Sequence, residues 1–171
     1  MRIFFYIILV ILIFVVALKF LSTIISLYFG SPSGETNKNL AREIFKKIGL
    51  AKNDILYDLG SGFGNTILAA NQFGAKTIGY EISPLPYLVS KIRLLGVKNT
   101  KVIFADINKI DFSGADVIYC YLLPEFLSNL SLKFKKLLMK HKTIISLSFS
   151  IKNLKPAQIL NINNKKVYIY R

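Results

Sequence analysis

The residues best suited to chemistry form one glycine-rich segment, Asp58-Leu59-Gly60-Ser61-Gly62-Phe63-Gly64. It follows a short apolar run, residues 55–59, and precedes a stretch of helical character, residues 65–72. Glycine permits positive φ and lets backbone N–H groups approach a ligand without a Cβ between them. The spacing is G-x-G-x-G, because Asn65 occupies the third glycine position of the dinucleotide pattern G-x-G-x-x-G. The segment therefore predicts a ligand-binding loop between a strand and a helix.

Two further acids follow the next predicted strands. Glu81 ends the strand expected at 76–80, and Asp106 lies just past the strand expected at 101–104. Because ligands of open α/β sheets bind at the carboxyl ends of parallel strands, Asp58, Glu81 and Asp106 are expected to face one crevice. Three carboxylates suit a ligand with an ammonium group, a ribose diol and an exocyclic amine. S-adenosylmethionine has all three and no phosphate, and is the expected cofactor.

Four segments together resemble class I methyltransferases. More closely, they resemble the lysine methyltransferases that act on mitochondrial membrane proteins such as the ATP synthase c-subunit, with their bacterial and archaeal relatives. The segments are Tyr57–Gly62, Gly79–Pro84, Ala115–Ile118 and Tyr121–Pro124. The resemblance covers roughly residues 30–160, and that family also carries an N-terminal hydrophobic segment. Phe63 departs from it, standing where the family usually has an acid, and residues 148–152 follow its aromatic/proline motif only loosely.

The resemblance implies a role for each site residue. Asp58 would bind the ammonium group of the cofactor, Glu81 its ribose hydroxyls and Asp106 its adenine amine. The loop backbone would surround the methionyl part, and Thr36 would reach the carboxylate. The implied cofactor residues are thus Thr36, Asp58, Gly60, Ser61, Gly62, Gly64, Glu81 and Asp106. The implied acceptor channel is lined by Tyr121, Leu122, Leu123 and Pro124. No residue of the sequence is identified as a catalytic base.

Simpler structural interpretations exist for these residues. Asp58 could cap the following helix, and Glu81 and Asp106 could be solvated strand ends. One cysteine, Cys120, excludes an internal disulfide and a cysteine-cluster zinc site, and one histidine argues against a histidine metal centre. Cys120 is expected in the core, and no metal site is predicted.

The elements that position these residues alternate between apolar strands and helical stretches. Thr36 is the expected N-cap of a first helix that ends at Gly49. Further helices are expected at 65–72, 85–94 and 124–139, and strands at 55–59, 76–80, 101–104, 115–121, 143–147, 158–162 and 167–170. Alternating βα units imply a parallel sheet, and Asn163-Asn164 is a hairpin signal. The predicted fold is α/β, a Rossmann-like class I methyltransferase sheet with a C-terminal antiparallel hairpin.

The N-terminus differs sharply in composition from the rest of the 171 residues. Residues 3–29 carry one charge, Lys19, and as a helix would span about 40 Å, against about 30 Å of bilayer hydrocarbon. We therefore expect a transmembrane anchor at 1–29, a linker at 30–35 and a methyltransferase domain at 36–171. A cleaved signal peptide or a buried core helix is the alternative. The basic residues Lys38, Arg42, Lys46 and Lys47 after the segment favour an outside N-terminus and a cytoplasmic domain.

The net charge of +14 admits acidic substrates, nucleic acid and anionic lipid as partners. Only four of the 23 basic residues are arginine, which argues against nucleic acid and leaves an anionic leaflet as the expected partner. The leading interpretation is a protein-lysine methyltransferase acting on a membrane-proximal protein. The alternatives are a small or lipid-soluble acceptor at the bilayer and a non-catalytic interaction module. The anchor is expected to hold the enzyme close to acceptors at the membrane surface. Deletion of residues 1–29 should therefore leave cofactor affinity nearly unchanged but strongly reduce methylation of the native membrane acceptor.

Overall fold

The computed structural model describes residues 2–28 and 35–171, and its centre is a seven-stranded sheet of order β3-β2-β1-β4-β5-β7-β6. The first five strands are parallel, and β7 pairs antiparallel with β5 and β6. The strands are β1 Ile55–Leu59, β2 Lys76–Glu81, β3 Thr100–Phe104, β4 Val117–Cys120, β5 Thr143–Leu147, β6 Gln158–Ile162 and β7 Lys165–Tyr170. This confirms the predicted fold class, with the β6–β7 hairpin turning at Asn163 and Asn164, both at positive φ.

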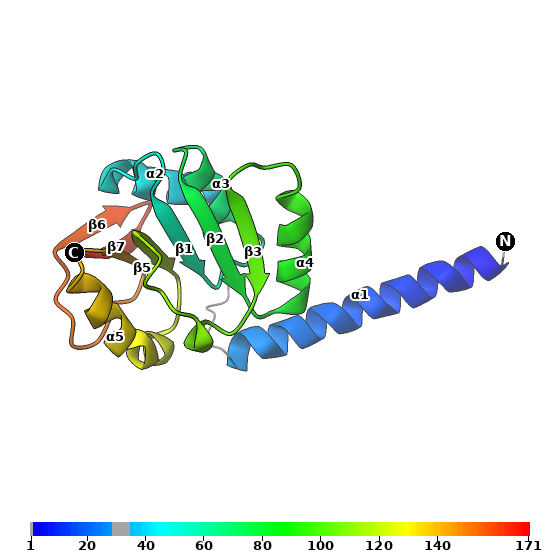
Figure 1. The fold of residues 1–171 in the computed structure, drawn as a ribbon. Helices are drawn as coiled ribbons and strands as arrows, with labels where there is room; N and C mark the ends of the chain where they lie inside the picture. The colour runs from blue at the N-terminus through cyan, green and yellow to red at the C-terminus, as the bar shows by residue number, and fades with distance from the viewer. Residues whose placement is uncertain (1, 29–34) are drawn as a thin grey trace.

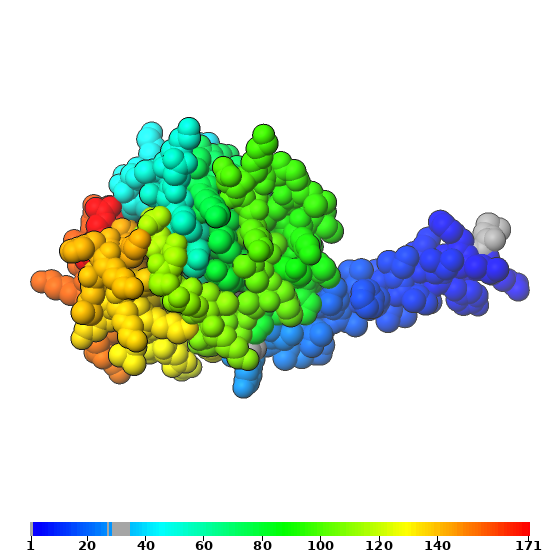
Figure 2. Space-filling model, viewed as in Figure 1, coloured from blue at the N-terminus to red at the C-terminus, as the bar shows by residue number. Residues whose placement is uncertain are grey.

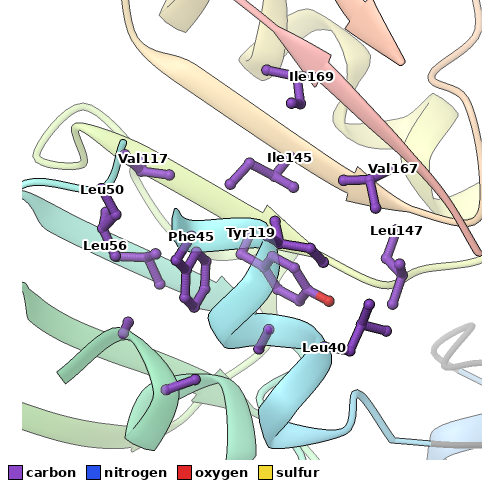
Figure 3. Packing of buried hydrophobic residues seen from close by; sticks show 14 of the residues in the cluster. Leu40, Phe45, Leu50, Leu56, Val117, Tyr119, Ile145, Leu147, Val167 and Ile169 are labelled. Carbon is purple, nitrogen blue, oxygen red and sulfur yellow. The ribbon is translucent and has the colours of Figure 1, made fainter. Parts of the chain in front are cut away.

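The helices of the domain cover both faces of this sheet (Figure 1). They are α2 Lys38–Ile48, α3 Asn65–Asn71, α4 Pro84–Arg93 and α5 Pro124–Leu138, with a short 3-10 helix at Ile107–Lys109. α2 and α3 pack on one face in a cluster with β1, β4, β5 and β7 (Figure 3). α5 packs on the other face. Because side chains alternate along a strand, β4 sends Val117 and Tyr119 into the first cluster and Ile118 and Cys120 into the second.

α1, Arg2–Tyr28, extends away from the domain as a single long helix (Figures 1 and 2). Residues Arg2–Ser26 are long and apolar enough to cross a membrane, and none of the apolar window is buried. The C-terminal end of α1 contacts the domain at α4. The predicted linker lies largely outside the described residues, since the structure does not describe 29–34.

The start of α2 differs from the expectation, whereas its end agrees with it. The N-cap of α2 is Asn37, whose side chain accepts a hydrogen bond from Asn39 N at 2.8 Å, so the prediction of Thr36 at this position was wrong. Thr36 is instead buried, and its hydroxyl bonds the Tyr119 hydroxyl at 2.9 Å. Gly49 ends α2 with φ of 73°, as predicted.

Two further titratable residues, Cys120 and Asp116, have structural roles. Cys120 is fully buried, and burial raises the pKa of its thiol to about 12, which confirms a core residue. Asp116 accepts hydrogen bonds from Lys142 Nζ at 2.7 Å and Ile55 N at 2.9 Å. It thereby joins the start of β1 to the turn before β5.

Candidate functional site

The glycine loop follows β1 and is tied to β2 by backbone hydrogen bonds. Gly60 N and Ser61 N both donate to Tyr80 O, at 2.9 and 3.1 Å. Gly60, Gly62 and Gly64 have φ of 77°, 53° and 82°, a region that favours glycine. The loop therefore takes a tight path that leaves its inner surface open to a ligand.

Two glycines act through packing rather than by contacting the ligand site. A Cβ at Gly79 would lie 2.6 Å from Ser61 Oγ, so glycine here lets the loop pack directly onto β2. A Cβ at Gly64 would lie 2.7 Å from Ser90 Oγ, so glycine here lets α3 approach α4. Gly64, predicted to contact the cofactor, lies outside the cavity described next. Gly79 was not among the predicted site residues, although it begins one of the segments that carry the family resemblance.

A cavity of about 640 Å³ opens at the carboxyl ends of β1, β2 and β4, a volume typical of small-molecule sites. Its walls come from the end of α1, the residues before α2, the glycine loop, the start of α4 and the end of β4. Seven predicted site residues line it: Thr36, Asp58, Gly60, Ser61, Gly62, Glu81 and Tyr121. The structure thus brings together most of the cofactor set predicted from the sequence.

Asp58 lies on the floor of this cavity with 2% of its surface exposed. Its Oδ2 atom is buried and has no hydrogen-bond partner among the described residues. Burial raises the pKa of Asp58 well above its ordinary value, and the nearby Glu81 carboxylate raises it further. A buried acceptor without a partner is costly, so the site is built for a cationic or hydrogen-bond-donating group beside Asp58.

Glu81 is also buried, at 5% exposure, but its carboxylate is held by the backbone on both oxygens. Ile82 N and Ser83 N donate to Oε1 at 2.9 and 2.7 Å, and Gly62 N donates to Oε2 at 2.8 Å. Glu81 therefore holds the glycine loop to the turn between β2 and α4. Each carboxylate oxygen has two lone pairs, so Oε2 retains one acceptor position for a ligand.

The remaining predicted residues lie beside the main cavity. Asp106 and Leu122 line a second cavity of about 20 Å³, which shares Gly60 and Glu81 with the first. The Asp106 side chain accepts from Asn108 N at 2.9 Å, so it caps the 3-10 helix. Leu123 is the N-cap of α5 and Pro124 opens that helix, and neither lines either cavity. Of the four predicted channel residues, Tyr121 alone reaches the main cavity.

The end of α1 supplies a wall that was not predicted from the sequence. Lys19, Ser22, Thr23 and Ser26 all line the cavity. Their spacing is i, i+3, i+4, i+7, which places them on one face of a helix, and this polar stripe is the signal that could have revealed them. The structure therefore gives the N-terminal segment a place in the wall of the cavity, which was not assigned to it from the sequence.

Two hydrogen bonds fix this wall to the start of α4. Ser22, which is 5% exposed, accepts from Leu85 N at 2.9 Å through its Oγ. Ser26 Oγ lies 2.8 Å from Ser83 Oγ. The first N–H groups of a helix have no partner within it, so α1 caps α4 from outside.

Glu35 forms the cavity edge nearest α3, and was likewise missed. It accepts from Asn65 Nδ2 at 2.9 Å, and Asn65 in turn accepts from Arg93 Nη2 at 3.0 Å. Arg93 also donates to Phe63 O and so clamps the loop. Burial raises the pKa of Glu35, while the Arg93 guanidinium opposes that change.

The opposite side of the cavity is aromatic. Tyr119 and Tyr121 line it from the end of β4, and the Tyr121 ring stacks with Phe149 at a centroid distance of 6.3 Å. Within residues 2–28 and 35–171, no group of three His, Cys, Asp or Glu side chains could hold a metal ion. The site thus combines buried carboxylates, a glycine loop and an aromatic wall.

Comparison with known proteins gives a consistent match. Residues 58–158 match the family described as the ANTKMT methyltransferase domain. A protein-lysine N-methyltransferase of Saccharolobus islandicus is 27% identical over 148 residues, covering 81% of this chain and 92% of that protein. The ATP synthase c-subunit lysine N-methyltransferase of Xenopus laevis is 27% identical, covering 70% of this chain but 54% of that protein, so the chain spans about half its length.

A solved structure agrees with the sequence matches. The RNA methyltransferase of Salinibacter ruber, in complex with S-adenosyl-L-homocysteine, superposes with a TM-score of 0.71 at 25% identity, covering 80% of this chain and 92% of that one. The acceptors in these names are lysine and RNA, so the acceptor has to be argued from the site itself.

Proposed function

The chain belongs to the ANTKMT methyltransferase domain family, and from that membership we propose that it transfers methyl groups to a lysine of a membrane-proximal protein. It is an S-adenosylmethionine-dependent methyltransferase, as the family match and the relatives described above support. The lysine acceptor rests on relatives at modest identity and on the position of the site.

The residues of the cavity fit the cofactor. We assign the unpartnered Asp58 Oδ2 to its ammonium group, because a buried carboxylate needs a cationic partner. Glu81 would accept from a ribose hydroxyl, and Asp106, in the adjoining small cavity, from the adenine amine. Ser61 Oγ, buried and without a partner among the described residues, adds one further polar contact. When bound, the cofactor supplies an activated methyl group on a sulfonium.

The protein's contribution to methyl transfer is alignment and control of the acceptor's charge. A lysine amine must be neutral to attack, and at pH 7 neutralisation costs about 3.4 pKa units, or about 4.6 kcal/mol, from a reference pKa of about 10.4. Desolvation beside Tyr119 and Tyr121 would favour the neutral amine. Loss of the proton to water then leaves a neutral nucleophile facing the methyl group.

One observation carries the membrane-proximal assignment: the helix that could span a bilayer ends in the wall of the cavity. A span beginning at Arg2 leaves the hydrocarbon core after about 20 residues. The polar stripe Lys19–Ser26 then lies at the interface, where a lysine stem can snorkel. The cavity would open at the membrane surface, within reach of lysines on membrane proteins.

The acceptor class is tested with native membranes from a host lacking this gene, incubated with the enzyme and methyl-labelled S-adenosylmethionine. We expect label in the protein fraction, recovered as methyllysine after acid hydrolysis. Asp58→Asn is the matched inactive control. Label confined to the lipid extract would replace lysine by a lipid-soluble acceptor, label in RNA would indicate nucleic acid, and no transfer would indicate a non-catalytic module.

We further propose that the catalytic domain faces the cytoplasm, since the basic residues Lys38, Arg42, Lys46 and Lys47 follow the span. A reporter that is active only in the cytoplasm should be active when it is fused after Arg171. A matched fusion of a reporter active only outside the cytoplasm should be silent. The reverse pattern, or release of a shortened soluble chain, contradicts the anchor and its orientation.

Glu81 gives a prediction that separates ribose binding from loop support. Glu81→Ala removes the carboxylate that accepts hydrogen bonds from three backbone N–H groups, and with it the ribose contact. S-adenosylhomocysteine affinity should therefore fall by about 100-fold, and the thermal stability of the protein should fall as well. Glu81→Gln keeps a carbonyl oxygen for part of the network, and should lose about 10-fold. Calorimetry on the full chain measures both, with the exposed Glu43→Gln as control. Unchanged affinity in a folded Glu81→Ala variant would remove the ribose role.

A further inference from the structure

We propose that α1 completes the cofactor site, and that the Lys19 ammonium pairs with the carboxylate of S-adenosylmethionine. The inference rests on the cofactor and is independent of which acceptor is methylated. In this proposal the apolar helix contributes directly to cofactor binding, in addition to any role as a membrane anchor.

The charges around the cavity support this pairing. Its charged lining residues, among those the structure describes, are Lys19, Glu35, Asp58 and Glu81. The cofactor carries one anionic group, its carboxylate, which the three acids would repel. Lys19 is the single cation in this set and makes no ion pair within the described residues. Arg93, close to the loop, already donates to Phe63 O and Asn65. Charge complementarity therefore assigns the carboxylate to Lys19.

A chain of hydrogen bonds connects α1 to the glycine loop. Ser26 Oγ bonds Ser83 Oγ at 2.8 Å, Ser83 N donates to Glu81 Oε1 at 2.7 Å, and Gly62 N donates to Glu81 Oε2 at 2.8 Å. α1 is thus bonded to the same residues that shape the loop. These bonds fix the C-terminal end of α1 relative to the glycine loop, and Lys19 on the same helix lines the same cavity.

The test compares two ligands by calorimetry on the full chain in detergent micelles. S-adenosylhomocysteine carries the carboxylate, whereas 5′-methylthioadenosine keeps the ribose and adenine but lacks the amino and carboxyl groups. Lys19→Gln should weaken S-adenosylhomocysteine by about 10-fold, the range of a charge-assisted pair, and leave methylthioadenosine unchanged. Lys19→Arg should retain most of the affinity.

The control is Lys98→Gln, an exposed lysine in the turn before β3, at the end of the sheet away from the cavity. It should change neither affinity. Unchanged S-adenosylhomocysteine binding in Lys19→Gln, or an equal loss for both ligands, overturns the pairing. Because no acceptor is present, failure of lysine methylation does not affect this result.

Discussion

Asp58→Asn is expected to weaken S-adenosylhomocysteine binding by about 100-fold or more while making the ligand-free protein more stable. The affinity falls because the ammonium group of the ligand loses its buried counter-charge. The stability rises because the ligand-free cavity no longer holds a carboxylate that is 2% exposed with an unpartnered Oδ2. Opposite signs for binding and stability distinguish a binding residue from a structural one.

The stability gain should depend on pH with a defined sign. The pKa of Asp58 in the folded protein is raised well above its ordinary value by burial and by Glu81. Below about pH 4, the pKa of an aspartate in the unfolded chain, the carboxyl group is protonated in both states and does not change the stability. As the pH rises from there toward the higher pKa of the folded state, the group increasingly destabilises the fold. The free energies of unfolding of the wild type and of Asp58→Asn, measured with denaturant, should be equal at low pH. As the pH is raised above about 4, Asp58→Asn should become the more stable of the two, whereas the control Glu43→Gln should not show this difference. Parallel curves at every pH, or undiminished affinity, contradict the role of Asp58.

The sequence predicted the parts of the site that local rules control. Apolar strands alternating with helices determine the sheet, and the sheet brings Asp58 and Glu81 to one edge at the end of β1 and β2. Gly60 and Gly62 follow from the positive φ that the loop requires. These residues could be placed because a βα unit has one right-handed geometry.

What the sequence did not predict depends on contacts between distant elements. Thr36 was expected as a helix cap, but its hydroxyl is bound to Tyr119, 83 positions away. Gly79 is required by the close packing of Ser61 against β2, which no local pattern reports. Leu122 turns away from the main cavity because the alternation of β4 continues beyond the strand and places it with Cys120 in the α5 cluster.

The polar stripe at the end of α1 is the clearest example of a contact that the sequence did not predict. Hydropathy identifies a candidate span but does not report the docking of its last two turns. Lys19 was expected as a snorkelling residue, and the structure adds that it lines the cavity. Lysine and hydroxyl side chains are suited both to a membrane interface and to the wall of a cofactor site. Composition alone therefore could not distinguish these two roles of the polar stripe.

Removing α1 should therefore have two effects that can be measured separately. Loss of Lys19 would lower cofactor affinity and reduce methylation of every acceptor alike. Loss of the membrane tether would reduce methylation of membrane acceptors alone, because a tethered enzyme meets them at an effective concentration that raises apparent affinity by about 10²–10⁴. The shortened chain is expected to fold, since the described hydrophobic clusters contain no α1 residue.

A membrane-surface site is tested most sharply by one ratio, the rate of membrane-protein methylation over that of a soluble lysine peptide at matched low enzyme concentration. Dividing the two rates cancels any change in cofactor affinity. We expect this ratio to fall by about 100-fold or more when residues 1–28 are removed, while Lys19→Gln in the full chain leaves it nearly constant. An equal ratio for the full and shortened chains would contradict a site held at the membrane surface for a membrane-proximal lysine.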